Sequence, residues 1–173
     1  EHPTQALLDL FCIRSEKGRL DGLTITVVGD LKFGRTVHSL GQLFGHYRVN
    51  LNLVSTPSLR VPAGLRSQLD AIANVTVRDY DMQDIGAALA DADVLYLTRI
   101  QKERFASEEE YLREKGTYVI DTAFLDRNRA KADLLVMHPL PRVDEIAYSF
   151  DADPRAAYFK QVRYGMFTRM ALL

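Results

Sequence analysis

Short runs of aliphatic and β-branched residues alternate with segments of helical periodicity along most of the chain, and this alternation constrains the fold more than any other feature. Such runs are typical of strands buried on both faces, and strands joined through helices predict right-handed crossovers and a parallel sheet. We therefore expect a single-domain α/β fold with three layers, in which helices cover both faces of a Rossmann-like parallel sheet. The predicted strands are Thr24 to Gly29, Val49 to Val54, Val75 to Val77, Val94 to Leu97, Tyr118 to Ile120 and Leu134 to Met137.

The charge balance argues against several classes of partner. The 173 residues include 22 lysines and arginines against 23 aspartates and glutamates, so the net charge of −1 offers no general attraction for nucleic acid or an anionic membrane. No apolar run approaches the roughly 20 residues that cross a bilayer, and the first residues do not resemble a signal peptide. The one cysteine, Cys12, has apolar neighbours and is expected to be a buried small residue rather than a catalytic thiol. We predict a cytoplasmic protein that binds neither nucleic acid nor membranes.

The two ends of the sequence do not look like the boundaries of a natural protein. Position 1 is not a methionine and begins directly in a polar motif, and residues 170–173 stop within an apolar helical pattern. We expect the chain to be a piece of a longer polypeptide.

Three polar loops follow predicted strands and are expected to meet at one edge of the sheet. The loop from Asp30 to Arg35 follows the first strand, Thr98 to Gln101 follows the run VLYL, and His138 to Arg142 follows the run LLVM. Because ligands of open parallel sheets bind outside the carboxyl ends of the strands, these loops predict a substrate site.

Arg35 and Arg99 are the residues in these loops best suited to bind anions. A planar guanidinium group can hold a carboxylate through two parallel hydrogen bonds, and Arg35 also opens a helix, whose N-terminus favours negative charge. The alternative for Arg35 is an ordinary surface salt bridge. Arg99 and Gln101 are expected to be functional, whereas residues 102–104 are more simply a solvated, mutually paired stretch.

The loop from His138 to Arg142 offers backbone acceptors. Two prolines around Leu140 remove amide donors, so the carbonyl groups can accept hydrogen bonds from a ligand such as an amine. A cis bond before Pro141 would aim these carbonyl groups. His138 and Arg142 are either ligands themselves or residues that fix the loop.

His2 and Gln5 stand three residues apart and share a face if the first turn is helical. An imidazole and a carboxamide side by side can stabilise one carbonyl oxygen and bind an adjacent amide group. The histidines match no metal-binding spacing, and no serine has an evident general base near it in sequence. We therefore expect no metal and no cofactor, and the sequence shows no evident activated nucleophile.

Five segments of the sequence carry a family resemblance, and they are EHPTQALLDLF, GDLKFGRTVHSL, LTRIQKERF, MHPLPRVDEI and DPRAAYFKQVRYGMFTRMALL. Through them the chain resembles the aspartate carbamoyltransferases, also called aspartate transcarbamoylases, from Glu1 to Leu173. It is similar to their aspartate-binding domain, roughly the second half of the catalytic chain. Ornithine carbamoyltransferases share the HPxQ opening, but they typically carry an HCLP loop and an SMG motif, and here the loop is HPLP and SMG is absent.

The resemblance implies a transferase that moves the carbamoyl group of carbamoyl phosphate to the amino group of L-aspartate in pyrimidine biosynthesis, giving N-carbamoyl-L-aspartate and phosphate. It implies that His2 hydrogen-bonds the carbonyl oxygen of carbamoyl phosphate and that Gln5 holds the carbamoyl nitrogen. The backbone at Leu140 and Pro141 would bind the carbamoyl NH2 group and orient the incoming amine.

The resemblance also assigns the aspartate side of the site. Arg35 and Arg99 would clamp the two carboxylates of aspartate, with Gln101 supporting the second clamp. The expected catalytic residues are then His2, Arg35 and Arg99. Phe33 departs from the tyrosine or histidine that the family often has at this position.

Parts of the family's site are absent from the sequence. The Ser-Thr-Arg-Thr-Arg phosphate-binding motif belongs to the preceding domain, and a lysine loop normally comes from a neighbouring subunit. We therefore expect the carbamoyl-phosphate-binding domain to be a missing partner and residues 1–173 to be the aspartate-binding domain. The parent is expected to be a homotrimer formed largely through the missing domain, so this chain by itself can be a monomer. The alternative function is an isolated folding module, or a weak dicarboxylate-binding module without turnover.

Overall fold

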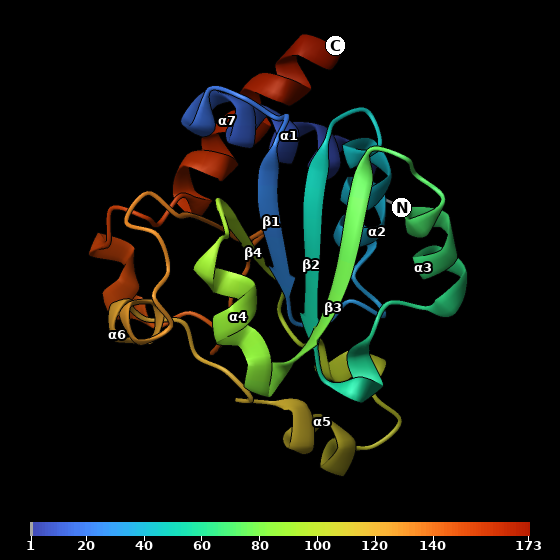
Figure 1. Cartoon of the computed structure of the whole chain (residues 1–173). Coiled ribbons are helices and arrows are strands. Elements are labelled where there is room, and N and C mark those ends of the chain that lie inside the picture. The colour runs from blue at the N-terminus through green and yellow to red at the C-terminus, as the bar shows by residue number, and fades with distance from the viewer. Residues whose placement is uncertain (1) are drawn as a thin grey trace.

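A five-stranded parallel sheet forms the centre of the computed structural model, which describes residues 2–173 (Figure 1). The strand order is β3-β2-β1-β4-β5, and every neighbouring pair is parallel. The first strand therefore lies in the middle of the sheet. The chain proceeds outward through β2 to β3 and then crosses back to form β4 and β5 on the other side of β1. The strands are β1 (Leu23–Val28), β2 (Val49–Ser55), β3 (Val75–Asp81), β4 (Val94–Leu97) and β5 (Leu135–Met137).

Helices cover both faces of this sheet, as the sequence predicts. Helices α1, α2 and α3 pack on one face together with Ile25 and Val27. Helices α4 and α6 pack on the other face with Val28. Neighbouring strand side chains point to opposite faces, so a strand covered on both sides is apolar at almost every position. The helices are α1 (Pro3–Lys17), α2 (Arg35–Phe44), α3 (Ala63–Asp70), α4 (Ile85–Ala90), α5 (Glu108–Glu114), α6 (Thr122–Arg127) and α7 (Tyr158–Leu172), with 3-10 turns at Pro57–Leu59, Met82–Asp84, Lys102–Arg104 and Tyr148–Ala152.

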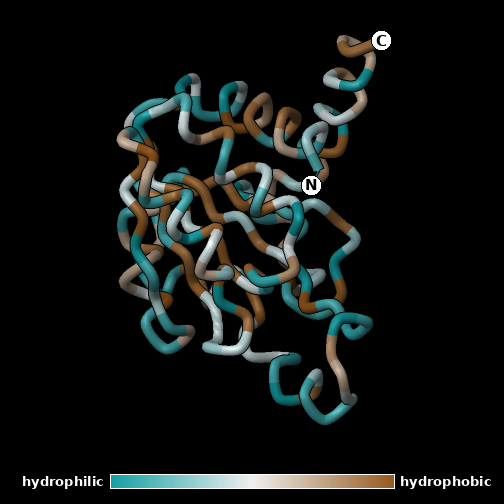
Figure 2. Tube along the Cα trace, turned by 90° about the vertical axis from the view of Figure 1, so that its right-hand side faces the viewer, coloured by the Kyte–Doolittle hydropathy of each residue, from teal (hydrophilic) through white to brown (hydrophobic). Residues whose placement is uncertain are grey.

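The first and last helices lie side by side. Tyr164 and Lys160 of α7 donate hydrogen bonds to the Glu16 carboxylate of α1, at 2.9 Å and 2.8 Å. Figure 2 shows that the end of α7 extends beyond the body of the molecule, whereas apolar residues concentrate along the strands in its middle. At the opposite end of the molecule, α5 protrudes with its predominantly polar sequence.

One predicted strand is wrong. Residues 118–120 do not join the sheet, and Ile120 makes only an isolated bridge with Ile146. Tyr118 and Ile120 are buried on the α4 side of the sheet while Val119 is exposed, which gives the same alternation as a strand. The edge of β5 is instead bridged by Ala156.

Strand β3 is longer than the sequence predicts. The apolar run ends at Val77, but pairing with β2 continues to Asp81 through polar residues. Strand β3 is at the edge of the sheet, where polar side chains reach solvent, so the apolar pattern alone marks too early an end.

Candidate active site

A cavity of about 410 Å³ lies where the loops after β1, β4 and β5 meet the start of α1 and the end of α7. The structure brings all seven sequence-predicted site residues into its lining, which also contains residues that the sequence analysis did not select. The predicted members are His2, Gln5, Arg35, Arg99, Gln101, Leu140 and Pro141, and the others are Asp30, Phe33, Gly34, Thr36, Thr98, Arg104, His138, Pro139 and Arg169.

Positive charge predominates in this lining. Four arginines line the cavity and a single carboxylate, that of Asp30, accompanies them. Arg35 and Arg169 make no ion pair within residues 2–173, and Arg99 is 3.3 Å from the Glu103 carboxylate. Unneutralised guanidinium groups beside a cavity suit a ligand with more than one negative charge.

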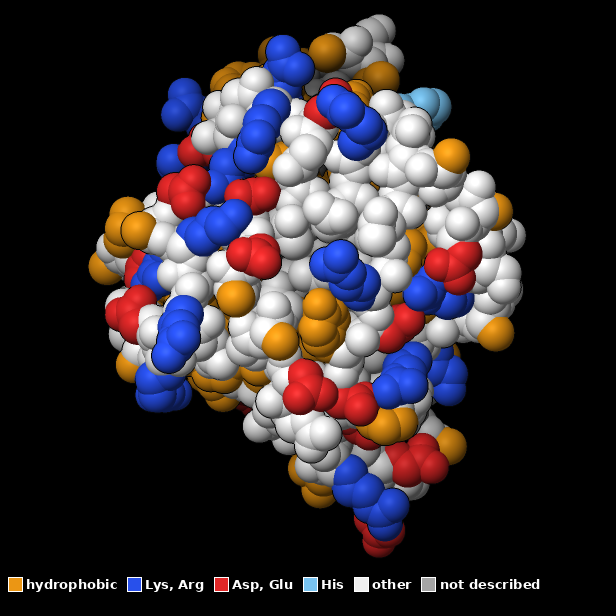
Figure 3. Space-filling view, viewed as in Figure 1, with side chains coloured by type: hydrophobic (Ala, Val, Ile, Leu, Met, Phe, Trp, Pro, Cys, Tyr) orange, Lys and Arg blue, Asp and Glu red, His pale blue; other side chains and the backbone are white. Residues whose placement is uncertain are grey.

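This positive character is local. On the face shown in Figure 3, lysine and arginine side chains are interspersed with aspartate and glutamate side chains. The net charge of the whole chain is −1. The attraction for anions therefore comes from the cavity lining and not from a general field of the protein.

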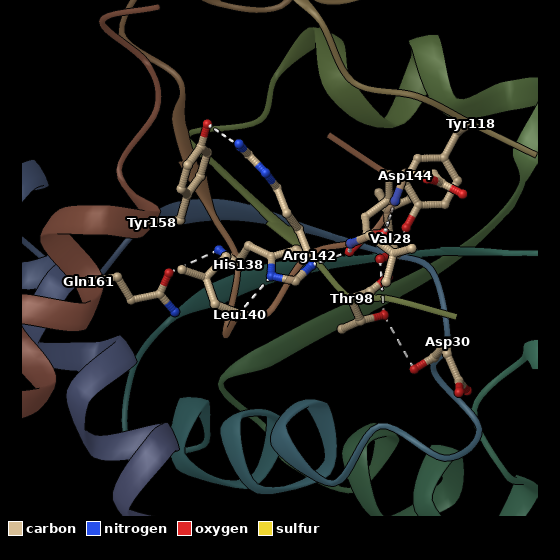
Figure 4. Close-up of polar contacts among 12 residues, drawn as sticks. Val28, Asp30, Thr98, Tyr118, His138, Leu140, Arg142, Asp144, Tyr158 and Gln161 are labelled. Atoms are coloured by element: carbon tan, nitrogen blue, oxygen red, sulfur yellow. Dashed lines mark hydrogen bonds and ion pairs between the residues drawn. The ribbon is translucent and has the colours of Figure 1, made fainter. Parts of the chain in front are cut away.

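The loop after β1 needs glycine where it approaches β4. Gly29 has φ +120°, and a Cβ atom there would lie 2.4 Å from the carbonyl oxygen of Thr98. The Tyr118 hydroxyl donates to the same carbonyl oxygen at 2.9 Å, and the Thr98 hydroxyl donates to the Val28 carbonyl oxygen at 3.3 Å (Figure 4). These contacts fix the carboxyl ends of β1 and β4 against each other.

Asp30 is a buried carboxylate in this loop. Its Oδ1 accepts from the Phe33 backbone N–H at 2.9 Å, while Oδ2 has no hydrogen-bond partner among the described residues. Burial raises the pKa of Asp30, and the backbone hydrogen bonds from Phe33 and Lys32 oppose that increase. The Asp30 turn places Arg35 at the start of α2.

His138 holds the loop after β5 by both ring nitrogens. The Leu140 backbone N–H donates to Nδ1 at 2.8 Å, so the proton of the neutral ring lies on Nε2, which donates to Glu145 at 2.7 Å. Burial alone would raise the pKa of the Glu145 carboxyl, but hydrogen bonds from His138 and backbone N–H groups lower it. The Leu140–Pro141 bond is cis, as predicted, and Leu140 has φ +51°. This loop is therefore held by side chains as well as by proline.

Arg142 fixes the loop and does not line the cavity. It binds Asp151 in a bidentate ion pair, in which Nη2 of Arg142 donates to Oδ2 of Asp151 at 2.7 Å. Nη1 of Arg142 also donates to the Tyr158 hydroxyl at 3.1 Å (Figure 4). Of the two interpretations left open for Arg142, the structure favours loop fixing.

Residues 2–173 offer neither a metal-binding cluster nor a membrane-spanning helix. No cluster of three or more histidine, cysteine, aspartate or glutamate side chains there could hold a metal ion. No helix in this range is long and apolar enough to cross a membrane.

Comparison with known proteins shows which family the chain with this cavity is similar to. Residues 21–173 match the family model described as aspartate/ornithine carbamoyltransferase, Asp/Orn binding domain. The multifunctional protein URA2 of Saccharomyces cerevisiae is 53% identical over the whole chain, which covers 8% of that protein. The aspartate carbamoyltransferase catalytic subunit of Clostridium kluyveri is 46% identical over the whole chain, which spans about half of that subunit, 55%.

Solved structures show the same fold. Aspartate transcarbamoylase from Trypanosoma cruzi, in complex with N-(phosphonacetyl)-L-aspartic acid, superposes with a TM-score of 0.89 at 46% identity, covering 99% of this chain and 55% of that one. The catalytic subunit of M. jannaschii aspartate transcarbamoylase gives a TM-score of 0.87 at 45% identity, covering 99% and 54%. The chain therefore belongs to the aspartate/ornithine carbamoyltransferase family and resembles the aspartate carbamoyltransferases in it over its whole length.

Proposed function

We propose that this chain is the aspartate-binding half of a transferase that moves the carbamoyl group of carbamoyl phosphate to the amino group of L-aspartate. The observation that carries the proposal is the shared cavity, in which Arg35 and Arg99 stand together with His2 and Gln5. Relatives at 45–46% identity that are named aspartate carbamoyltransferase or aspartate transcarbamoylase support the same reaction.

The proposed roles follow from the chemistry of each group. Arg35 and Arg99 bind the two carboxylates of aspartate. Gln101 supports the second of these contacts. Its carboxamide oxygen accepts from Arg104 at 3.3 Å, and its NH2 group makes no hydrogen bond among the described residues, so this NH2 group can donate to the bound carboxylate. His2 donates to the carbamoyl oxygen as negative charge develops there.

The backbone of the loop after β5 completes the site. Carbonyl groups around Leu140 and Pro141 accept hydrogen bonds from the carbamoyl NH2 group and from the attacking amine. Catalysis is then positioning combined with preorganised electrostatics. It requires no metal or cofactor from the described residues.

A second polypeptide segment is proposed to supply the phosphate-binding groups. The chain spans 55% of the C. kluyveri subunit. Apolar side chains of α7 are exposed, among them Val162 at 55%, Met166 at 53% and Met170 at 66%. We propose that the carbamoyl-phosphate domain of the parent covers this surface and that the parent is a cytoplasmic homotrimer.

The alternative is a weak dicarboxylate-binding module that has no turnover by itself. Arg35 is exposed and forms no ion pair among the described residues, so an aspartate carboxylate would remain partly solvated there. This alternative and the transferase share the same arginines but differ in product formation.

Titration calorimetry with L-aspartate tests the binding of aspartate by Arg35 and Arg99, which both functions share. We expect weak binding that is lost in Arg35→Ala and in Arg99→Ala. Arg78→Ala is the matched control, because Arg78 is exposed on edge strand β3 and lies outside the cavity lining. Binding that survives both cavity substitutions would contradict the assignment.

Product formation separates the two functions. The chain is mixed with a separately produced carbamoyl-phosphate domain, and N-carbamoyl-L-aspartate is measured after addition of both substrates. The transferase predicts product only when both parts are present. Absence of product from the complete mixture, with aspartate binding intact, would favour the binding module.

A further inference from the structure

A buried carboxylate lies behind the cavity and has no place in the roles proposed above. Asp9 of α1 is fully buried, at 0% exposure. No lysine, arginine or histidine within residues 2–173 forms an ion pair with it. Burying a carboxylate without a cation is costly unless several donors satisfy it.

Donors from three elements satisfy Asp9. Gln5 of α1 and Gln161 of α7 donate their side-chain NH2 groups to Oδ1, at 2.9 Å and 2.7 Å. The Tyr96 hydroxyl of β4 donates to Oδ2 at 2.8 Å. Burial raises the pKa of Asp9 to about 6, and the three hydrogen bonds oppose that increase. Both oxygens of Asp9 accept from these groups, so the side chain acts here as an acceptor.

An acceptor at this position decides the orientation of Gln5. A carboxamide has an oxygen acceptor at one end and an NH2 donor at the other. Because Asp9 takes the NH2 end, the Gln5 oxygen is the end left for the cavity that Gln5 lines. A ligand at this point must therefore offer an N–H group.

The same acceptor decides the orientation of Gln161. Its NH2 group faces Asp9, so its oxygen accepts the His138 backbone N–H at 2.9 Å (Figure 4). His138 in turn accepts from Leu140. One buried carboxylate thereby orients two carboxamides and, through the second, anchors the loop after β5.

We infer that Asp9 is a positioning residue that makes the cavity wall formed by Gln5 and the His138 to Leu140 backbone a set of hydrogen-bond acceptors for an NH2-bearing group. The inference rests on the proposed function for the identity of that group, the carbamoyl NH2. A purely structural Asp9 would stabilise the core without affecting which ligand atoms the cavity prefers.

Nuclear magnetic resonance of the 15N-labelled chain tests the orientation without any activity. In the unmodified chain, one side-chain amide proton of Gln5 and one of Gln161 should be shifted downfield and protected from exchange. Asp9→Leu should lose both signatures, because leucine offers no acceptor to the two NH2 groups that donate to Oδ1. Tyr96→Phe should keep them, because the acceptor remains. Unchanged amide signals in folded Asp9→Leu would overturn the inference.

Kinetics of the complete catalytic protein test the consequence for the ligand. Asp9→Leu should raise the KM for carbamoyl phosphate about tenfold, the effect of one lost hydrogen bond, with a smaller change in the KM for aspartate. Thr26→Val is the matched control, because Thr26 is a buried residue outside the cavity lining and its hydroxyl donates to the Ala88 carbonyl oxygen at 2.7 Å. It should lower stability and leave both KM values unchanged.

The outcomes separate the two proposals. If the unmodified protein forms no carbamoyl-aspartate, the proposed function fails, whatever the amide signals show. If the unmodified protein is active and Asp9→Leu keeps its KM for carbamoyl phosphate within twofold, the positioning role of Asp9 fails and the proposed function stands.

Discussion

Replacing Asp9 with asparagine should remove a specific dependence of stability on pH. Burial raises the pKa of Asp9 from 3.8 to about 6. The folded state therefore binds a proton more tightly than the unfolded state. The contribution of Asp9 to the free energy of unfolding is fully present below about pH 4 and is lost as the pH rises through 6.

The magnitude follows from the size of the shift. Each pKa unit corresponds to about 1.4 kcal/mol, so the shift of Asp9 corresponds to a loss of about 3 kcal/mol between pH 4 and pH 7, roughly half of it above pH 5. Tyr96 and Cys12, two titratable groups that interact with Asp9, do not contribute to this pH dependence. Burial raises the pKa of Tyr96 well above its usual value and that of Cys12 to about 12, so neither ionises in this range.

Urea unfolding followed by circular dichroism measures this effect. The quantity to compare is the difference in unfolding free energy between the unmodified chain and Asp9→Asn at pH 5, 6 and 7.5. Other carboxylates titrate in both proteins and cancel in this difference. Asp133→Asn serves as a control on an exposed carboxylate. A difference that stays constant with pH, or that shifts in favour of the unmodified chain as the pH rises, would refute the reasoning.

Three other substitutions or treatments give simple tests. Gly29→Ala should destabilise the fold by about 3 kcal/mol or more in urea unfolding, because its Cβ would collide with the Thr98 carbonyl oxygen; a loss below 1 kcal/mol would contradict the close approach. Arg142→Lys should cost about 1 kcal/mol in the same assay, since lysine cannot form the bidentate pair with Asp151; equal stability would show that the fork is unimportant. Cys12 should not react with a thiol reagent in the folded chain at pH 8 and should react fully in urea, because it is buried and its pKa is raised to about 12.

The strands were predictable where both of their faces are covered. Strand β4 was located at its observed bounds, because all four of its residues are buried and apolar. The alternation of buried and exposed residues failed as a strand signal where residues are buried beside the sheet and not within it. Tyr118 and Ile120 alternate with exposed Val119 as strand residues do, but they pack against the side of the sheet rather than within it.

The cavity was predictable from its loops but not in full. Arg35, Arg99 and Leu140 follow strand ends, and parallel strands bring such loops to one edge of a sheet. Arg169 joins them from the last turns of α7, and no local pattern distinguishes it from Arg163, the other arginine of the same helix. Asp9 was also missed, because its partners Tyr96 and Gln161 are 87 and 152 residues away in sequence.

The unequal anchoring of the two sides of the cavity has a consequence for inhibitor design. The wall after β5 is fixed by His138, Glu145 and Gln161, whereas Arg35 is exposed and makes no ion pair with any residue from 2 to 173. Under the proposed function, an inhibitor that joins a dicarboxylate to an amide-like group should lose little potency when one methylene lengthens its dicarboxylate end, because long guanidinium side chains can follow the displaced charge. Compounds that exchange the amide-like end for an ester or a ketone should lose much more.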